Sequence, residues 1–254
     1  MKNPLIYLFN NFFRLLNKIS YGFVKSFYII NYRPSYDEDG FVTSHNSDFI
    51  MTNNFMRSYN LGLNTGSSYG WNIKWRIHNA CFFANYAKNL PGDFVECGTN
   101  KGMTALSIID NINFADIKKN FYLIDTFEGV VDNMLTIREK KKKDTPIYES
   151  CYGEVLNTFS KFSNVFVIKG IIPKVLPDIN IKQISFIHID LNSSKSEELA
   201  INFFWNKVVE GGIILLDDYA YSGFNDTRKM WDNFAKSKNI RILTFPTGQG
   251  LIIK

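Results

Sequence analysis

Carboxylates follow two short apolar runs in the second half of the chain. Asp190 closes the run ISFIHID, and Asp217 and Asp218 lie at the end of the run GGIILLDDY. Both runs are rich in β-branched residues, as in buried strands of a parallel sheet. Ligands of open α/β sheets bind beyond the carboxyl ends of the strands, where three carboxylates would repel one another without a cation. Because Mg²⁺ prefers oxygen ligands, we predict a site for Mg²⁺ or another divalent cation. The alternative is that the aspartate pair caps a loop or helix.

A glycine-bearing turn precedes these runs in the segment GDFVECGTNKGMTALS. The predicted strand ends near Glu96, and Gly98 and Gly102 lead into a helix. Glycine allows close approach of a ligand to the backbone, and a helix start offers free N–H groups. The spacing differs from the G-x-G-x-x-G of NAD enzymes and is closer to the E/D-x-G-x-x-x-G turn of S-adenosylmethionine (SAM) enzymes. We predict that Glu96, Gly98, Thr99 and Gly102 bind SAM; a turn without a ligand is the alternative.

A further acid follows the next predicted strand. The segment NFYLIDTFEG places Asp125 at the strand end. An acid at this point of a nucleotide-binding sheet commonly accepts hydrogen bonds from ribose hydroxyls, and SAM contains that ribose. We therefore predict that Asp125 binds the cofactor, with a loop-capping aspartate as the alternative.

Strand and helix patterns alternate from residue 93 to the end of the chain, as in an α/β domain with helices on both faces of a parallel sheet. The predicted strands are residues 93–97, 120–125, 164–170, 183–190 and 211–217, and the predicted helices are residues 101–112, 150–163, 194–208 and 225–238. Residues 240–245 and 250–254 are predicted to pair as a closing hairpin.

The chain before residue 91 divides into two parts. Residues 1–35 are predicted to contain a basic amphipathic helix, because apolar residues recur at helical spacing over residues 4–31. Charged residues interrupt this stretch, so we expect it to contact a membrane peripherally or to pack on protein, including a second copy of the chain, rather than to span a bilayer. Residues 36–90 form a lead-in with a short helix near 46–58 and a second at 71–89, and residues 91–254 form the main domain.

Charge and cysteine content narrow the class of protein. The formal net charge is +5, and five basic residues precede Asp37, the first acidic residue. The remainder is therefore close to neutral, which argues against a nucleic-acid-binding protein. The three cysteines show no zinc or disulfide spacing, so we predict reduced thiols and a cytoplasmic protein, with any membrane contact peripheral at the inner membrane.

Over roughly residues 70–254, the chain resembles the TylF-type (macrocin) O-methyltransferase family, a class I SAM-dependent methyltransferase family. The resemblance rests on GDFVECGTNKG, IDTFEG, IKGIIPKVLP, IHIDLNSSKSEELAINFFW, GGIILLDDY and TGQGLIIK. It implies a Rossmann-like, seven-stranded, mostly parallel sheet, SAM as methyl donor, a divalent metal and a sugar hydroxyl as acceptor. It also implies that Asp190, Asp217 and Asp218 bind the metal. Residues 191–195 depart from the family's Met-Tyr-Glu-Ser-Thr-like run.

These observations predict a metal-dependent SAM O-methyltransferase that acts on a sugar of a bacterial surface glycan or glycosylated natural product. The acceptor is a nucleotide-linked sugar, a lipid-linked unit or a finished polymer. The general base is unassigned. His188 and Lys195 are candidates, the latter because catechol-type methyltransferases use a lysine shortly after their first metal ligand. One alternative is a nucleotide-dependent oxidoreductase, against which the missing G-x-G-x-x-G argues. The other is a non-catalytic SAM- or sugar-binding partner subunit.

Overall fold

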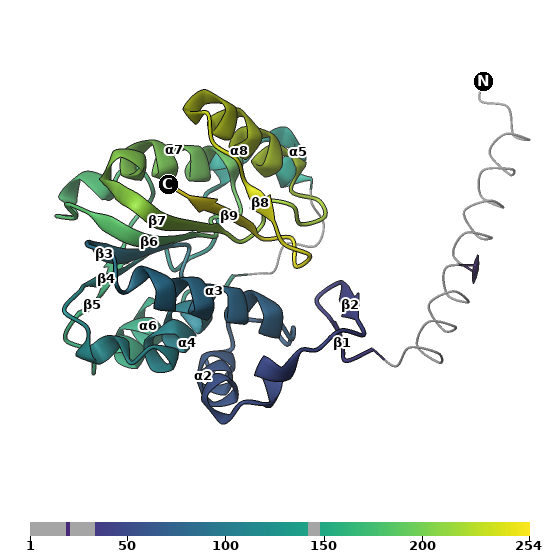
Figure 1. Cartoon of the computed structure of the whole chain (residues 1–254). Helices are drawn as coiled ribbons and strands as arrows, with labels where there is room; N and C mark the ends of the chain where they lie inside the picture. Colours follow the sequence, from purple (N-terminus) through teal and green to yellow (C-terminus); the bar gives the residue numbers. More distant parts are fainter. Residues whose placement is uncertain (1–18, 21–33, 142–147) are drawn as a thin grey trace, which may run out of the picture. The chain divides into compact units, whose positions relative to one another are not determined.

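The computed structural model describes residues 19–20, 34–141 and 148–254, and residue contacts divide the chain into the units Met1–Asp48 and Phe49–Lys254 (Figure 1). Apart from residues 19 and 20, the predicted N-terminal helix lies outside the described residues. In the first unit, strands β1 (Tyr36–Glu38) and β2 (Phe41–Thr43) pair antiparallel. Their turn contains Asp39 and Gly40, both at positive φ, as a tight hairpin requires.

A seven-stranded sheet with the order β5-β4-β3-β6-β7-β9-β8 forms the centre of the second unit. The first five strands of this order are parallel, β9 is antiparallel to β7, and β8 is antiparallel to β9. This confirms the predicted α/β fold and its closing hairpin. The strands are β3 (Asp93–Cys97), β4 (Phe121–Asp125), β5 (Val165–Lys169), β6 (Ile184–Ile189), β7 (Val208–Leu216), β8 (Leu243–Thr244) and β9 (Gly250–Ile253).

Helices cover both faces of this sheet (Figure 1). One face carries α3 (Lys74–Ala87), α4 (Met103–Asn111) and α6 (Tyr152–Phe159), with α2 (Asn53–Leu63) packed on α4. The other face carries α7 (Ser194–Phe204) and α8 (Asn225–Lys238), close to the short α5 (Ile137–Lys140). Single 3₁₀ turns lie at Asp48–Met51, Phe114–Asp116, Asp132–Met134, Leu176–Asp178 and Trp205–Lys207. In the part of the chain that the structure describes, no helix is long and apolar enough to cross a membrane.

Alternation along the central strands creates a separate core on each face. Phe94 and Phe186 pack with α3 and α4, whereas Val95 and Ile187 point to the opposite core under α7 and α8. Two residues further along each strand, the same alternation brings polar side chains to the α3 side of the sheet edge. The fold therefore positions the site at the carboxyl ends of β3 and β6.

The prediction of a short helix near residues 46–58 is wrong in its extent. The chain makes a 3₁₀ turn at Asp48–Met51, becomes extended at Thr52, and then forms α2 as far as Leu63. The reason is packing: Phe55 and Tyr59 are buried on one face of α2, so the amphipathic helix continues for as long as it covers α4.

Candidate active site

The turn after β3 lies directly against the first of the three aspartates. Gly98 has φ of 91°, and a Cβ on it would lie 1.7 Å from the carbonyl oxygen of Asp190. The backbone N–H of Asp190 donates to the Cys97 carbonyl at 2.8 Å, which keeps the two segments in register. Only glycine combines this conformation with this close approach, so the turn and the aspartate site are built as one unit.

Asp125 joins this turn to the one after β4. One of its oxygens accepts a hydrogen bond from the Asn100 N–H at 2.7 Å, and the other accepts from the Phe127 N–H at 2.8 Å. The side chain is half-buried at the end of β4. Asp125 therefore caps both turns, which agrees with the loop-capping alternative. Its position beside the glycine turn also agrees with a role as a cofactor ligand.

Buried polar atoms beneath the glycine turn lack partners. Glu96 Oε1 lies 3.0 Å from His188 Nδ1, but Glu96 Oε2 and Thr99 Oγ1 have no hydrogen-bond partner within the described residues. Burial raises the pKa of Glu96, and the hydrogen bond with His188 offsets part of that increase. Leaving a buried polar atom unpaired costs about 1–3 kcal/mol, so such atoms indicate a place where a polar ligand or water belongs.

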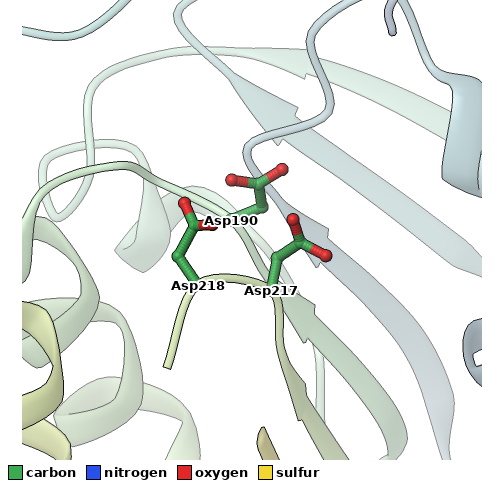
Figure 2. Close-up of side chains that lie close together, drawn as sticks. All are labelled: Asp190, Asp217 and Asp218. Carbon is green, nitrogen blue, oxygen red and sulfur yellow. The ribbon is translucent and has the colours of Figure 1, made fainter. Parts of the chain in front are cut away.

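The three aspartates that the sequence singled out converge in space. Asp190 follows β6, and Asp217 and Asp218 follow the neighbouring β7, so their carboxylates emerge at the same sheet edge (Figure 2). One oxygen from each lies within 4.8 Å of the others, which is a spacing that a metal ion could bridge. Burial, followed by the charges of Asp217 and Asp218, raises the pKa of Asp190 well above its usual range. Burial and the two neighbouring carboxylates thus both disfavour ionisation of Asp190.

Asp217 is held by a network of side chains. Arg76 Nη1 lies 2.5 Å from Asp217 Oδ2, and Gln249 Nε2 donates to Asp217 Oδ1 at 3.1 Å. His188 Nε2 lies 3.6 Å from the same Oδ1. Burial alone would raise the pKa of Asp217, but the charges of Arg76 and His188 bring it below its usual range.

The two candidate bases occupy different surroundings. Burial alone would lower the pKa of His188, but Asp217 and Glu96 raise it to about 10. Nδ1 is hydrogen-bonded to Glu96, whereas Nε2 forms only an ion pair with Asp217. An imidazolium held between two carboxylates has no free nitrogen lone pair to accept a proton, which fits a positioning role better than that of a base. Lys195 is exposed on the first turn of α7 and belongs to neither the buried network nor the aspartate cluster.

Sequence reasoning missed Arg76 and Gln249. Arg76 comes from the lead-in helix α3, far from Asp217 in the chain, and Gln249 belongs to the closing hairpin segment. The burial of Arg76 beside Ile77 and Ala80 is known only from the structure, because the apolar residues of α3 do not form a single stripe. Arginine is rarely buried without a partner, but the sequence indicates neither the burial nor the acid that pairs with it.

A further buried carboxyl, that of Glu197, lies on α7. Glu197 Oε2 accepts a hydrogen bond from Trp231 Nε1 of α8 at 2.6 Å. Burial raises the pKa of Glu197 from 4.5 to about 8. Between these two pH values the folded protein therefore keeps a proton on Glu197 that the unfolded chain releases.

This difference predicts a pH-dependent effect of Glu197→Gln. Because the folded-state pKa is raised, the wild type loses stability as pH rises from the unfolded pKa towards about 8. Glutamine keeps an acceptor for Trp231 and removes the ionisation. In chelator, the variant should match the wild type near pH 5 and exceed it near pH 9 by up to roughly 4 kcal/mol in urea unfolding. Exposed Glu198→Gln is the control; parallel pH profiles of Glu197→Gln and wild type would refute the assignment.

The parallel sheet with an antiparallel closing hairpin, the glycine turn after β3 and the acid ending β4 together define a class I methyltransferase. A comparison with protein-family models matches residues 75–244 to "Macrocin-O-methyltransferase (TylF)". This match spans more than half of the chain, so the chain belongs to the macrocin-O-methyltransferase (TylF) family and is a SAM-dependent O-methyltransferase. The predicted resemblance is confirmed, and the oxidoreductase alternative is set aside.

Solved structures confirm the fold. The O-methyltransferase NovP superposes with a TM-score of 0.62 at 19% identity, covering 70% of this chain and 79% of NovP. The calicheamicin methyltransferase CalS11 superposes with a TM-score of 0.55 at 12% identity, covering 86% of this chain and 97% of CalS11. The SAH-bound methyltransferase PaMTH1 of Podospora anserina superposes with a TM-score of 0.56 at 14% identity, covering 93% of this chain and 96% of PaMTH1. The search of curated proteins gives no match.

Proposed function

We propose that this enzyme methylates a sugar hydroxyl and that Asp190, Asp217 and Asp218 hold a divalent cation, such as Mg²⁺, for the reaction. The observation that carries the proposal is the contact between Gly98 of the cofactor turn and the Asp190 backbone. Methyl donor and acceptor must meet in line, and this contact puts the two proposed sites side by side. A sugar acceptor is supported by the likeness to CalS11, described as a TDP-rhamnose 3′-O-methyltransferase (TM-score 0.51, 11% identity).

The residues below the glycine turn fit SAM. The unpaired atoms Glu96 Oε2 and Thr99 Oγ1 suit its polar amino-acid end, and half-buried Asp125 suits its ribose hydroxyls. Gly98 and Gly102, both at positive φ, give the turn its shape, since a side chain on Gly98 would meet Asp190 and one on Gly102 would meet Phe159. SAM supplies a methyl group on a sulfonium, which is already electrophilic, so the chain's task is to hold and align it.

The aspartate cluster fits a hard cation, because it offers three carboxylate oxygens within reach of one ion. A bound divalent cation acts as a Lewis acid that lowers the pKa of an acceptor hydroxyl. Asp190, Asp217 and Asp218 would fix the position of that charge relative to the cofactor turn. The residue that takes the hydroxyl proton is not assigned.

Tyr69 and Tyr148 are the aromatic residues that we expect to contact the acceptor. The rings of Tyr69 and Tyr148 are 6.0 Å apart in an edge-to-face contact. Burial, and then the charges of Asp190 and Asp218, raise the pKa of Tyr148, so its hydroxyl lies within the field of the aspartates and stays protonated. An aromatic face close to a metal site suits the apolar face of a sugar ring.

The acceptor sugar is part of a surface glycan or a glycosylated natural product. It is presented as a nucleotide-linked sugar, as a lipid-linked unit or within a finished polymer.

Removal of divalent cations provides the test. Purified protein is incubated with SAM and a panel of nucleotide-linked and free sugars, and transfer is followed as S-adenosylhomocysteine release and as a mass gain of one CH₂ on the acceptor. We expect transfer that chelator abolishes and Mg²⁺ restores, because the hydroxyl is weakly acidic without a Lewis acid. Methyl transfer that persists in chelator would refute the proposed role of a divalent cation. SAM binding without transfer to any acceptor would favour the partner-subunit alternative.

A further inference from the structure

Arg76 contacts the aspartate cluster but has no part in the chemistry proposed above. Its side chain is buried, with 7% of its surface exposed. Nη1 lies 2.5 Å from Asp217 Oδ2 and 3.7 Å from Asp218 Oδ1, and the guanidinium lies 4.6 Å from the centre of the Tyr221 ring. A guanidinium keeps its positive charge at every accessible pH. A permanent cation is therefore in contact with two of the three proposed metal ligands.

The surrounding residues hold this ion pair in a defined geometry. Asn79, one turn after Arg76 on α3, donates from Nδ2 to Gln249 Oε1 at 3.0 Å. Gln249 Nε2 in turn donates to Asp217 Oδ1 at 3.1 Å. Helix α3 thus orients one oxygen of Asp217 directly and the other through Gln249. Burying an arginine is unfavourable unless it is paired, so the buried Arg76 depends on its contacts with the two aspartates.

We propose that Arg76 is a built-in counter-ion of the aspartate cluster, sharing it with the divalent cation; this rests on the cation site of the proposed function. With a cation bound, the three ionised carboxylates carry three negative charges, and Arg76 balances one of them. Glu96 and His188 form a pair of their own that adds one charge of each sign. The two negative charges that remain match one divalent cation. Arg76 holds Asp217 and Asp218 in place when no metal is bound, because otherwise the clustered carboxylates would repel one another.

The proposal predicts how Arg76→Met responds to metal. Without Arg76, the metal-free protein retains uncompensated buried charge, so its unfolding temperature in chelator should fall by about 5–10 °C. Saturating Mg²⁺ then supplies the missing positive charge. Its stabilising shift should be at least about twice the wild-type shift, because the metal now binds a more negative site. Arg57→Met, which removes an exposed ion pair with Asp110, should leave the Mg²⁺ shift unchanged.

The double variant Arg76→Met/Asp217→Asn restores the charge balance and should unfold at a higher temperature in chelator than Arg76→Met alone, even if the single variant is largely unfolded. A double variant no more stable than the single one would overturn the counter-ion role. So would an Mg²⁺ shift in Arg76→Met equal to or smaller than that of the wild type. A wild type that Mg²⁺ does not stabilise at all would instead refute the cation site of the proposed function.

Discussion

Replacing Gly98 with alanine is expected to abolish methyl transfer and to lower the free energy of unfolding by about 2–6 kcal/mol. The residue has φ of 91°, and its new Cβ would lie 1.7 Å from the Asp190 carbonyl oxygen. That carbonyl cannot retreat freely, because the Asp190 N–H is bonded to Cys97. The clash would separate the cofactor turn from the aspartate cluster, so both SAM binding and metal binding should weaken. Urea unfolding, calorimetric SAM binding and the transfer rate measure the effect.

Gly66→Ala is the matched control for this substitution. Gly66 has a similar φ of 76°, but no atom lies within 4 Å of where its Cβ would be. It should show only the backbone strain, about 1 kcal/mol, and keep normal SAM binding. If Gly98→Ala lost no more stability than Gly66→Ala and bound SAM normally, the close approach between the turn and Asp190 would not be what holds the site together.

Asp190→Asn is expected to reduce methyl transfer by at least about a hundredfold without destabilising the metal-free protein. Lewis-acid catalysis contributes several kcal/mol, and each 1.36 kcal/mol is a factor of ten in rate. Stability should not fall, because burial and the charges of Asp217 and Asp218 raise the pKa of Asp190. Asparagine therefore resembles the protonated form that the metal-free site favours. Thermal unfolding with and without Mg²⁺ and the transfer rate are the measurements.

SAM binding should survive in Asp190→Asn, because Gly98 contacts the backbone of that residue and not its carboxylate. Asp116→Asn, at an exposed aspartate distant from the cluster in the fold, controls for loss of charge. A variant at Asp190 that kept both the Mg²⁺ stabilisation and the wild-type rate would exclude this carboxylate as a metal ligand.

Much of the site could be predicted from local sequence. Asp190, Asp217 and Asp218 follow apolar runs, and parallel strands that neighbour one another deliver their ends to one edge of the sheet. The glycine turn and Asp125 follow the same rule, and the structure joins them through the Asn100 N–H. These predictions depend on strand periodicity and on the type of residue at the strand end, both of which are local properties of the chain.

Other parts of the site depend on long-range packing. The pairing of Glu96 with His188 comes from the register between β3 and β6, which strand patterns do not specify. Arg76 is a charged residue on a helix, and only the docking of α3 against the sheet edge brings it to Asp217. The sequence determined the strands, the turn and the acids at their ends. The tertiary structure decided which charged residues pair with one another. These ion pairs join segments that are far apart in the chain, and no periodic pattern in the sequence indicates which distant segments will pack together.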